Sequence, residues 1–122
     1  MKKLLLAVLL VAFISCIACH KEHQSGVSLR IQNTTSKSFT DVSSNGVSFG
    51  SVDALATTPY KPFQKILEVP FATVVVDADT LGIGNIFIDL PSYFTRGKYT
   101  LQIVADTSTY NGYSCTFIGD PE

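Results

Sequence analysis

Val27-Ser28-Leu29-Arg30-Ile31-Gln32-Asn33 is the stretch that decides the fold class of this chain. Apolar Val27, Leu29 and Ile31 alternate with polar side chains, so every second residue faces the same side. This period of two is typical of a β-strand with one buried face. Residues 99–105 repeat the alternation, and residues 72–76 form a run rich in β-branched side chains.

Similar patterns recur along the chain, separated by Gly, Asn, Asp, Ser and Pro at short intervals. We expect strands at 27–33, 39–44, 47–52, 57–67, 71–77, 85–90, 97–107 and 113–119. About seven strands in roughly 100 residues are typical of a β-sandwich. The predicted fold class is therefore all-β, a single antiparallel β-sandwich over residues 27–122. Pro59 and Pro62 remove two backbone donors, which makes 57–67 an edge strand or a crossing between sheets.

The Asn45-Gly46 pair predicts a tight reversal between two strands. A two-residue loop pairs Ser44 with Val47 and Val42 with Phe49, so both large apolar residues fall on one face. We expect a type I′ turn here, with positive φ at both loop residues.

The Asn111-Gly112 pair predicts a different reversal. A two-residue loop would put Ile103 and Cys115 on opposite faces. A three-residue loop over residues 110–112 pairs Thr109 with Tyr113 and restores the parity, with Gly112 in the left-handed conformation of a bulge. In that register Thr107 lies opposite Cys115, and Ala105 opposite Phe117.

The N-terminal residues have the pattern of an export signal. Lys2 and Lys3 precede an uncharged apolar run that begins at Leu4 and ends at Ser15 or Ala18. A transmembrane helix needs about 20 apolar residues, so this run is too short to span a bilayer and fits the helix of a signal peptide.

Cys16 and Cys19 stand where the apolar run ends and the polar stretch from His20 begins. This arrangement resembles a bacterial lipobox, in which a cysteine is acylated through its sulfur and becomes the new N-terminus. Cys19 is the preferred lipidation site, because Ala18 precedes it and polar residues follow directly; Cys16 is the alternative. The expected domains are a signal peptide at 1–18, a flexible tether at 19–26 and a β-sandwich at 27–122. The resemblance implies a membrane partner through the acyl chain and a place in the cell envelope, at the outer membrane, with the periplasmic and surface faces both open.

Removal of the signal changes the charge balance. Lys2 and Lys3 are lost from the nine basic residues, which leaves seven against ten acidic residues. Nucleic acid requires a clustered basic surface, so we expect no nucleic-acid partner. Cys115 is then the single cysteine besides the anchor, and no internal disulfide is expected.

His20 and His23 are the chain's two histidines, and both fall in the tether. The folded domain therefore has no base for Ser-His or Cys-His nucleophilic chemistry. We predict no enzyme, no catalytic residue, no metal site and no cofactor. Cys115 is expected to be a small core hydrophobe.

The segment around Asp77-Ala78-Asp79 allows two further hypotheses. It lacks the oxygen ligands of an EF-hand loop, but a looser calcium site from Asp77, Asp79 and Asn85 remains an alternative to a polar β-turn. Asp79-Thr80-Leu81 resembles the short motif on which Bacteroidota attach O-glycans, which implies possible O-glycosylation of Thr80.

Four stretches resemble known small domains: Asn33-Thr34-Thr35, residues 41–52, residues 57–63, and Arg96-Gly97-Lys98-Tyr99-Thr100-Leu101. The first three resemble small lipoproteins of Bacteroidota that carry domains of unknown function. The fourth looks like the start of a strand in transthyretin-like and other immunoglobulin-like sandwiches. The resemblance implies a fold and an address, and no activity.

Aromatic residues near the expected connections give the remaining functional hint. Tyr60, Tyr93, Phe94 and Tyr110 are the candidate binding aromatics, which could stack on a sugar or anchor a protein. The alternative is that they plug the ends of the sandwich. We expect a non-catalytic module that binds carbohydrate or an envelope protein. The competing hypothesis is a structural or accessory subunit of a cell-surface assembly, with an edge strand at 57–67 or near the C-terminus that accepts another strand.

Overall fold

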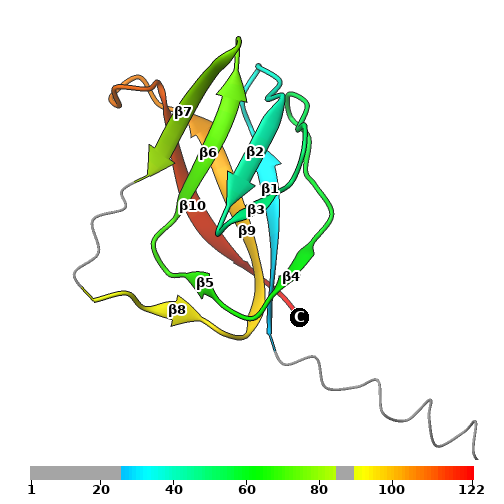
Figure 1. Cartoon of the computed structure of the whole chain (residues 1–122). Coiled ribbons are helices and arrows are strands. Elements are labelled where there is room, and N and C mark those ends of the chain that lie inside the picture. The colour runs from blue at the N-terminus through cyan, green and yellow to red at the C-terminus, as the bar shows by residue number, and fades with distance from the viewer. Residues whose placement is uncertain (1–25, 85–89) are drawn as a thin grey trace, which may run out of the picture.

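The computed structural model describes residues 26–84 and 90–122 (Figure 1). These residues form a sandwich of two four-stranded sheets, as the strand pattern predicts. The first sheet has the order β10 (Tyr113–Asp120), β9 (Gly97–Ala105), β1 (Val27–Asn33) and β4 (Lys61–Phe63). The second has the order β3 (Val47–Ser48), β2 (Asp41–Ser44), β6 (Phe71–Val76) and β7 (Asp79–Gly84). A small ribbon of β5 (Ile66–Leu67) and β8 (Tyr93–Phe94) lies at the lower end in Figure 1.

Alternate residues of both sheets fill the space between them. Leu29, Ile31, Leu101 and Ile103 are fully buried on the inner face of the first sheet. The inner face of the second sheet contributes Val42, Ala72, Val74, Val76 and Ile83. This contact removes the predicted apolar stripes from water, which is the main favourable contribution to folding. The described residues contain no helix with the length and apolar character needed to cross a bilayer.

One strand pair departs from the expected antiparallel arrangement. β1 and β9 run parallel, with Val27 opposite Gly97 and Asn33 opposite Ile103. The reason is topological. Between β1 and β9 the chain forms the whole second sheet as well as the antiparallel edge strand β4, and it then enters β9 in the same direction as β1. A parallel pair needs such a long crossover.

The turn at Asn45-Gly46 is confirmed. Asn45 has φ of 52° and Gly46 of 77°, and Ser44 lies opposite Val47. Beyond that pair, Val42 bonds with both Phe49 and Gly50, so a bulge replaces the expected one-to-one pairing of Val42 with Phe49.

The register predicted at Asn111-Gly112 is wrong, although its parity is right. Ala105 pairs with Tyr113, and the connection spans residues 106–112. The chain leaves the strand early because the Asp106 carboxylate accepts hydrogen bonds from the Ser108 amide at 3.0 Å and its hydroxyl at 2.6 Å. Gly112 does adopt positive φ, at 79°.

Strand β7 is missing from the sequence-based prediction, which placed residues 78–84 between the expected strands 71–77 and 85–90. Asp77 and Ala78 do form a tight turn, with φ of 51° and 66°, and the chain then continues as β7 against β6. Gly84 has φ of 97°, and a Cβ there would lie 2.3 Å from the carbonyl oxygen of Pro70. This glycine is therefore required by a close backbone approach and not by a turn.

Residues 57–67 confirm the expectation of an edge that crosses between sheets. Thr57 bridges to Gln32, β4 forms the edge of the first sheet, and β5 leaves it for the ribbon with β8. The expected strand 85–90 falls largely on residues outside the described ranges. The signal peptide at 1–18, Cys16, Cys19 and the tether up to residue 25 also lie outside them.

Candidate functional site

The four candidate aromatics come from three separate places in the fold. Phe94 belongs to the ribbon and is stacked on Tyr99, with ring centroids 4.3 Å apart and an interplanar angle of 11°. Its edge also meets Phe117 at 5.7 Å. Phe94 therefore plugs one end of the sandwich, as the structural alternative predicted.

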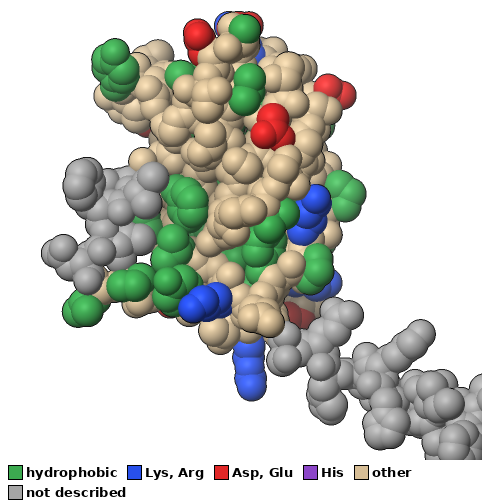
Figure 2. All heavy atoms as spheres, viewed as in Figure 1, with side chains coloured by type: hydrophobic (Ala, Val, Ile, Leu, Met, Phe, Trp, Pro, Cys, Tyr) green, Lys and Arg blue, Asp and Glu red, His purple; other side chains and the backbone are tan. Residues whose placement is uncertain are grey.

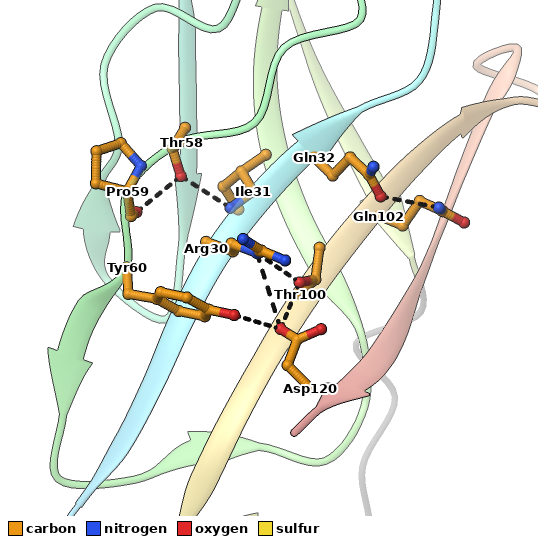
Figure 3. A network of polar contacts seen from close by, with 9 residues as sticks. All are labelled: Arg30, Ile31, Gln32, Thr58, Pro59, Tyr60, Thr100, Gln102 and Asp120. Atoms are coloured by element: carbon orange, nitrogen blue, oxygen red, sulfur yellow. Dashed lines mark hydrogen bonds and ion pairs between the residues drawn. The ribbon is translucent and has the colours of Figure 1, made fainter. Parts of the chain in front are cut away.

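Tyr60 lies on the outer face of the first sheet (Figure 3). Its hydroxyl donates a 2.8 Å hydrogen bond to the Asp120 carboxylate. The Arg30 guanidinium carbon lies 4.7 Å from the ring centroid, and the Lys98 ammonium nitrogen lies 5.5 Å from it. Cations already occupy the neighbourhood of this ring, so a sugar would have to displace them before stacking on it.

Tyr93 and Tyr110 lie at opposite ends of the molecule. Tyr93 belongs to β8 and is 38% exposed, with the Lys65 ammonium 4.2 Å from its ring centroid. Tyr110 is fully exposed in the connection between β9 and β10. Within the described ranges, these four side chains do not form one surface.

A polar network braces the outer face of the first sheet (Figure 3). Arg30 Nε donates to Thr100 Oγ1 at 2.8 Å, and Thr100 Oγ1 donates to Asp120 Oδ2 at 2.6 Å. The Asp120 side chain is only 12% exposed and lies 3.8 Å from Arg30 Nε. Partial burial raises the pKa of Asp120, but hydrogen bonds from Thr100 and Tyr60 and the charges of Arg30 and Lys98 outweigh it and bring that pKa below its usual value.

This network ties four segments together. Arg30 belongs to β1, Thr100 to β9 and Asp120 to β10, while Tyr60 precedes β4. Burial and the bond to Asp120 raise the pKa of the Tyr60 phenol. Each charged group is paired within the network, so the geometry of the network is that of an interaction that stabilises the fold.

Cys115 lies on β10, is half-buried and packs against the hydrophobic core. Its sulfur lies 3.9 Å from the carbonyl oxygen of Ile83. Burial raises the pKa of this thiol to about 11. The thiolate is the reactive form of cysteine, so this site is unsuited to nucleophilic chemistry at neutral pH.

The remaining candidate residues lie around the Asp77-Ala78 turn. Asp77 forms an ion pair with Lys37, and Asp79 begins β7. Thr80 is exposed on β7, where a modifying enzyme could reach it. Among the described residues, no three His, Cys, Asp or Glu side chains gather as a metal site would require. Asn85, His20 and His23 lie outside the described ranges.

Strand β10 forms an edge that the predicted site residues did not include. Across residues 26–84 and 90–122, its only sheet neighbour is β9. The Asp106 amide donates to the Gly112 carbonyl, and hydrogen-bonded pairs alternate along an antiparallel ladder. The hydrogen-bonded pairs therefore include Ser114 with Val104 and Thr116 with Gln102, and the backbone groups of Cys115, Phe117 and Gly119 point away from β9.

The β10 edge lacks the usual devices that prevent strand addition. Residues 113–119 include neither a charged residue nor a proline. Thr116, Ile118 and Gly119 are exposed, Ile118 to 40%. Native edge strands are normally protected by lysines, prolines, bulges or short length.

The other three edges of the two four-stranded sheets are less available. β4 has three residues and contains Pro62, and β3 has two residues. Asn111 Nδ2 hydrogen-bonds to the outward carbonyl of Gly82 on β7.

A scan against protein-family models and a search of curated proteins returned no match to this chain.

Proposed function

We propose that this chain is a lipid-anchored protein of the cell envelope, acylated at Cys19, whose sandwich is a non-catalytic module that binds an extended segment of another envelope protein. The contact is the addition of a strand along β10. The observation that supports it is the eight-residue length of β10 together with an uncharged run over residues 113–119. Such an edge presents a row of backbone donors and acceptors to any extended chain.

The arrangement of the aromatics favours a protein over a carbohydrate partner. A sugar-binding surface needs rings that converge on one face. Phe94 is packed against Tyr99, Tyr60 is bonded to Asp120, and Tyr93 and Tyr110 lie at opposite ends. A protein segment that pairs with β10 needs none of these rings.

The same edge serves the second hypothesis, a structural or accessory subunit. That hypothesis expected an accepting strand at 57–67 or near the C-terminus. In residues 57–67 the edge strand is β4, which is short and contains Pro62. Near the C-terminus the edge strand is β10, which is long. Binding module and assembly subunit thus share one contact, and they differ in how permanent the contact is.

The contact is tested in intact bacteria with a photo-crosslinking residue at Ile118 of the full-length chain. The matched control carries it at Thr73, which is also exposed on an outward strand position but lies in β6, inside the second sheet. We expect one discrete adduct from position 118 and none from position 73. Equal adducts from both positions would refute strand addition, and an adduct with the mass of two copies would show self-pairing instead.

Gly119→Pro makes the test specific for backbone pairing. The Gly119 amide points away from β9, so proline there removes an outward donor and spares the internal ladder. We expect this variant to keep its far-ultraviolet circular dichroism and lose the adduct. Thr116→Lys, which places a charge on the edge without touching the ladder, is the second variant should proline disturb the fold. An adduct that survives in a folded variant contradicts the proposal.

The anchor is tested separately by incorporation of labelled palmitate and mass spectrometry of the mature N-terminus. We expect an acylated Cys19, loss of the label in Cys19→Ser, and retention in Cys16→Ser. A free amine on Cys16, or a mature chain without an acyl group, contradicts this part.

A further inference from the structure

The two ends of the sandwich differ in charge. We call the end at which β1 begins the basal end; it comprises residues 26, 61–68, 90–98 and 120–122. The opposite, apical end comprises residues 34–41, 53–56, 77–79 and 106–112. The strand registers of the first sheet define the two ends. Val27, at the start of β1, lies opposite Gly97 and Phe63, which marks the basal end, whereas Asn33, at the end of β1, lies opposite Ile103.

Basic residues gather at the basal end. The cations there are Lys61, Lys65, Arg96 and Lys98, all exposed. Its acids are Glu68, Glu122 and Asp120, and the last of these is paired with Arg30. The apical end has the opposite character, with five acids, Asp41, Asp53, Asp77, Asp79 and Asp106, and one cation, Lys37.

Apolar side chains accompany the basal cations. Leu90 is 88% exposed and Tyr93 is 38% exposed, and the Lys65 ammonium lies 4.2 Å from the Tyr93 ring centroid. Figure 2 shows apolar and basic side chains side by side at the lower end, over β5 and β8, with acidic side chains at the upper end. An exposed aliphatic residue, an aromatic residue and several cations on one surface are typical of contact with the membrane interface.

The chain enters the domain at this same end. Gly26 begins the described chain, and a Cβ there would lie 2.7 Å from the Phe63 carbonyl oxygen, so this residue is held against β4. An open hollow of about 440 Å³ is lined by Gly26, Gln64, Thr95 and Arg96. Arg96, one of its lining residues, supplies the cation with which the phosphate of a lipid headgroup can pair.

We infer that the basal end docks on an anionic phospholipid surface, with Tyr93 and Leu90 at the headgroup level and Lys65, Arg96 and Lys98 against lipid phosphates. This inference rests on the proposed anchor, because tethering through the N-terminus brings this end to the bilayer. Docking would hold the domain upright, with the acidic apical end away from the negatively charged surface. Juxtamembrane cations are attracted to anionic lipids over about one Debye length.

The chain contains no tryptophan, so Tyr93→Trp provides a single fluorescent probe at the basal end. Tyr110→Trp is the matched control, because Tyr110 is exposed at the apical end. The mature chain purified from bacteria is placed on vesicles of phosphatidylcholine alone or of equal parts phosphatidylcholine and phosphatidylglycerol. We expect a blue-shifted emission and several-fold weaker quenching by iodide for Tyr93→Trp on the anionic vesicles, and no change for Tyr110→Trp.

The charge contribution is tested by adding Lys65→Gln and Arg96→Gln to the Tyr93→Trp chain. We expect most of the emission shift to be lost, and high salt to have the same effect on the chain without these changes. A shift that is equal on both lipids, equal for both probes, or unaffected by the two glutamines overturns the inference. Acylation is measured before the vesicle experiment. A chain that carries no acyl group refutes the proposed anchor, and it is then added to preformed vesicles so that docking is tested by itself. A failed anchor and a failed docking surface therefore give distinguishable results.

Discussion

Asn33 is the residue whose replacement tests the packing of the apical end most directly. It is fully buried at the end of β1. Its Nδ2 donates to the carbonyl oxygens of Lys37 at 2.7 Å and Asp53 at 3.1 Å, and lies 3.4 Å from that of Val52. Its Oδ1 accepts from the Thr35 amide at 2.9 Å and from the Thr35 hydroxyl at 2.7 Å. One side chain thus joins the connections on both sides of the short β2–β3 hairpin to the first sheet.

The cost of removing this amide can be worked from these bonds. Each hydrogen bond contributes about 1 kcal/mol net, and a buried group left without a partner costs about 1–3 kcal/mol. Thr35 keeps its second bond to the Lys37 carbonyl at 3.1 Å, so the loss is smaller than the full count of contacts suggests. We expect Asn33→Ala to lower the free energy of unfolding by about 3–5 kcal/mol, a large part of the roughly 5–15 kcal/mol available to a domain.

Asn33→Asp sharpens the test, because its shape is conserved while a donor becomes an acceptor. At neutral pH the new carboxylate faces carbonyl oxygens in a buried site, which raises its pKa in the folded state. A carboxyl with a raised folded pKa destabilises above its unfolded pKa of about 3.9, and this penalty disappears as the pH falls below that value. Asn33→Asp should therefore be less stable than Asn33→Ala at pH 7 and recover relative to it at pH 3.

The assay is urea unfolding followed by circular dichroism at both pH values. Gln32→Ala is the matched control, since Gln32 is the neighbouring residue and its amide pairs with Gln102 on the outer face. We expect a change below about 0.5 kcal/mol for this control. Two results would refute the reasoning: Asn33→Ala unfolding at the same urea concentration as the control, or a stability of Asn33→Asp that does not depend on pH relative to the unmodified chain.

Three further predictions concern separate sites. Gly84→Ala should lower the free energy of unfolding by about 3 kcal/mol or more, measured by thermal unfolding, because the new Cβ would lie 2.3 Å from the Pro70 carbonyl oxygen. The control is Gly46→Ala, which has a similar positive φ but open surroundings and should cost only about 1 kcal/mol. Equal effects of the two variants would count against the close approach of Gly84 to Pro70. Cys115, with a pKa of about 11, should react with iodoacetamide at pH 8 about 100-fold more slowly than a free thiol of pKa 9; comparable rates would show that the thiol is not desolvated. The lowered pKa of Asp120 means that its stabilising contribution is present above about pH 4 and is lost as the pH falls through the folded value. The difference in urea midpoint between the unmodified chain and Asp120→Asn should therefore be largest at pH 7 and decrease as the pH is lowered below about 4, and a difference that does not depend on pH would contradict this role.

The parts of the fold that follow from local chemistry were predictable. Residues 27–33 and 99–105 alternate so regularly that only one face of each could be buried, and both strands are present. Asn45-Gly46 forms the expected turn because its two residues tolerate positive φ. In each case the deciding interaction lies within a few residues of the chain.

The features that were missed depend on distant contacts. β7 contains two glycines and follows a turn without glycine, Asp77-Ala78, so its strand character comes from pairing with β6. The parallel pairing of β1 with β9 depends on the path of the whole second sheet. The aromatics were singled out by residue type, and only packing shows that Phe94 is stacked against Tyr99. The accepting edge was expected at 57–67 or near the C-terminus, and the choice between these two places stayed open because the neighbours of a strand cannot be read from its own residues.

The two proposals constrain each other. β10 runs antiparallel to β9, and β9 runs parallel to β1, so β10 runs from the apical end toward the basal end. If two copies paired antiparallel through β10, their basal ends would lie at opposite ends of the shared sheet. Both could not then dock on one bilayer. A strand supplied by another protein carries no such restriction, because it can pair in either direction while the basal end stays on the lipid. Membrane docking at the basal end therefore disfavours antiparallel pairing of two copies through β10, whereas it leaves a foreign strand free to pair in either direction.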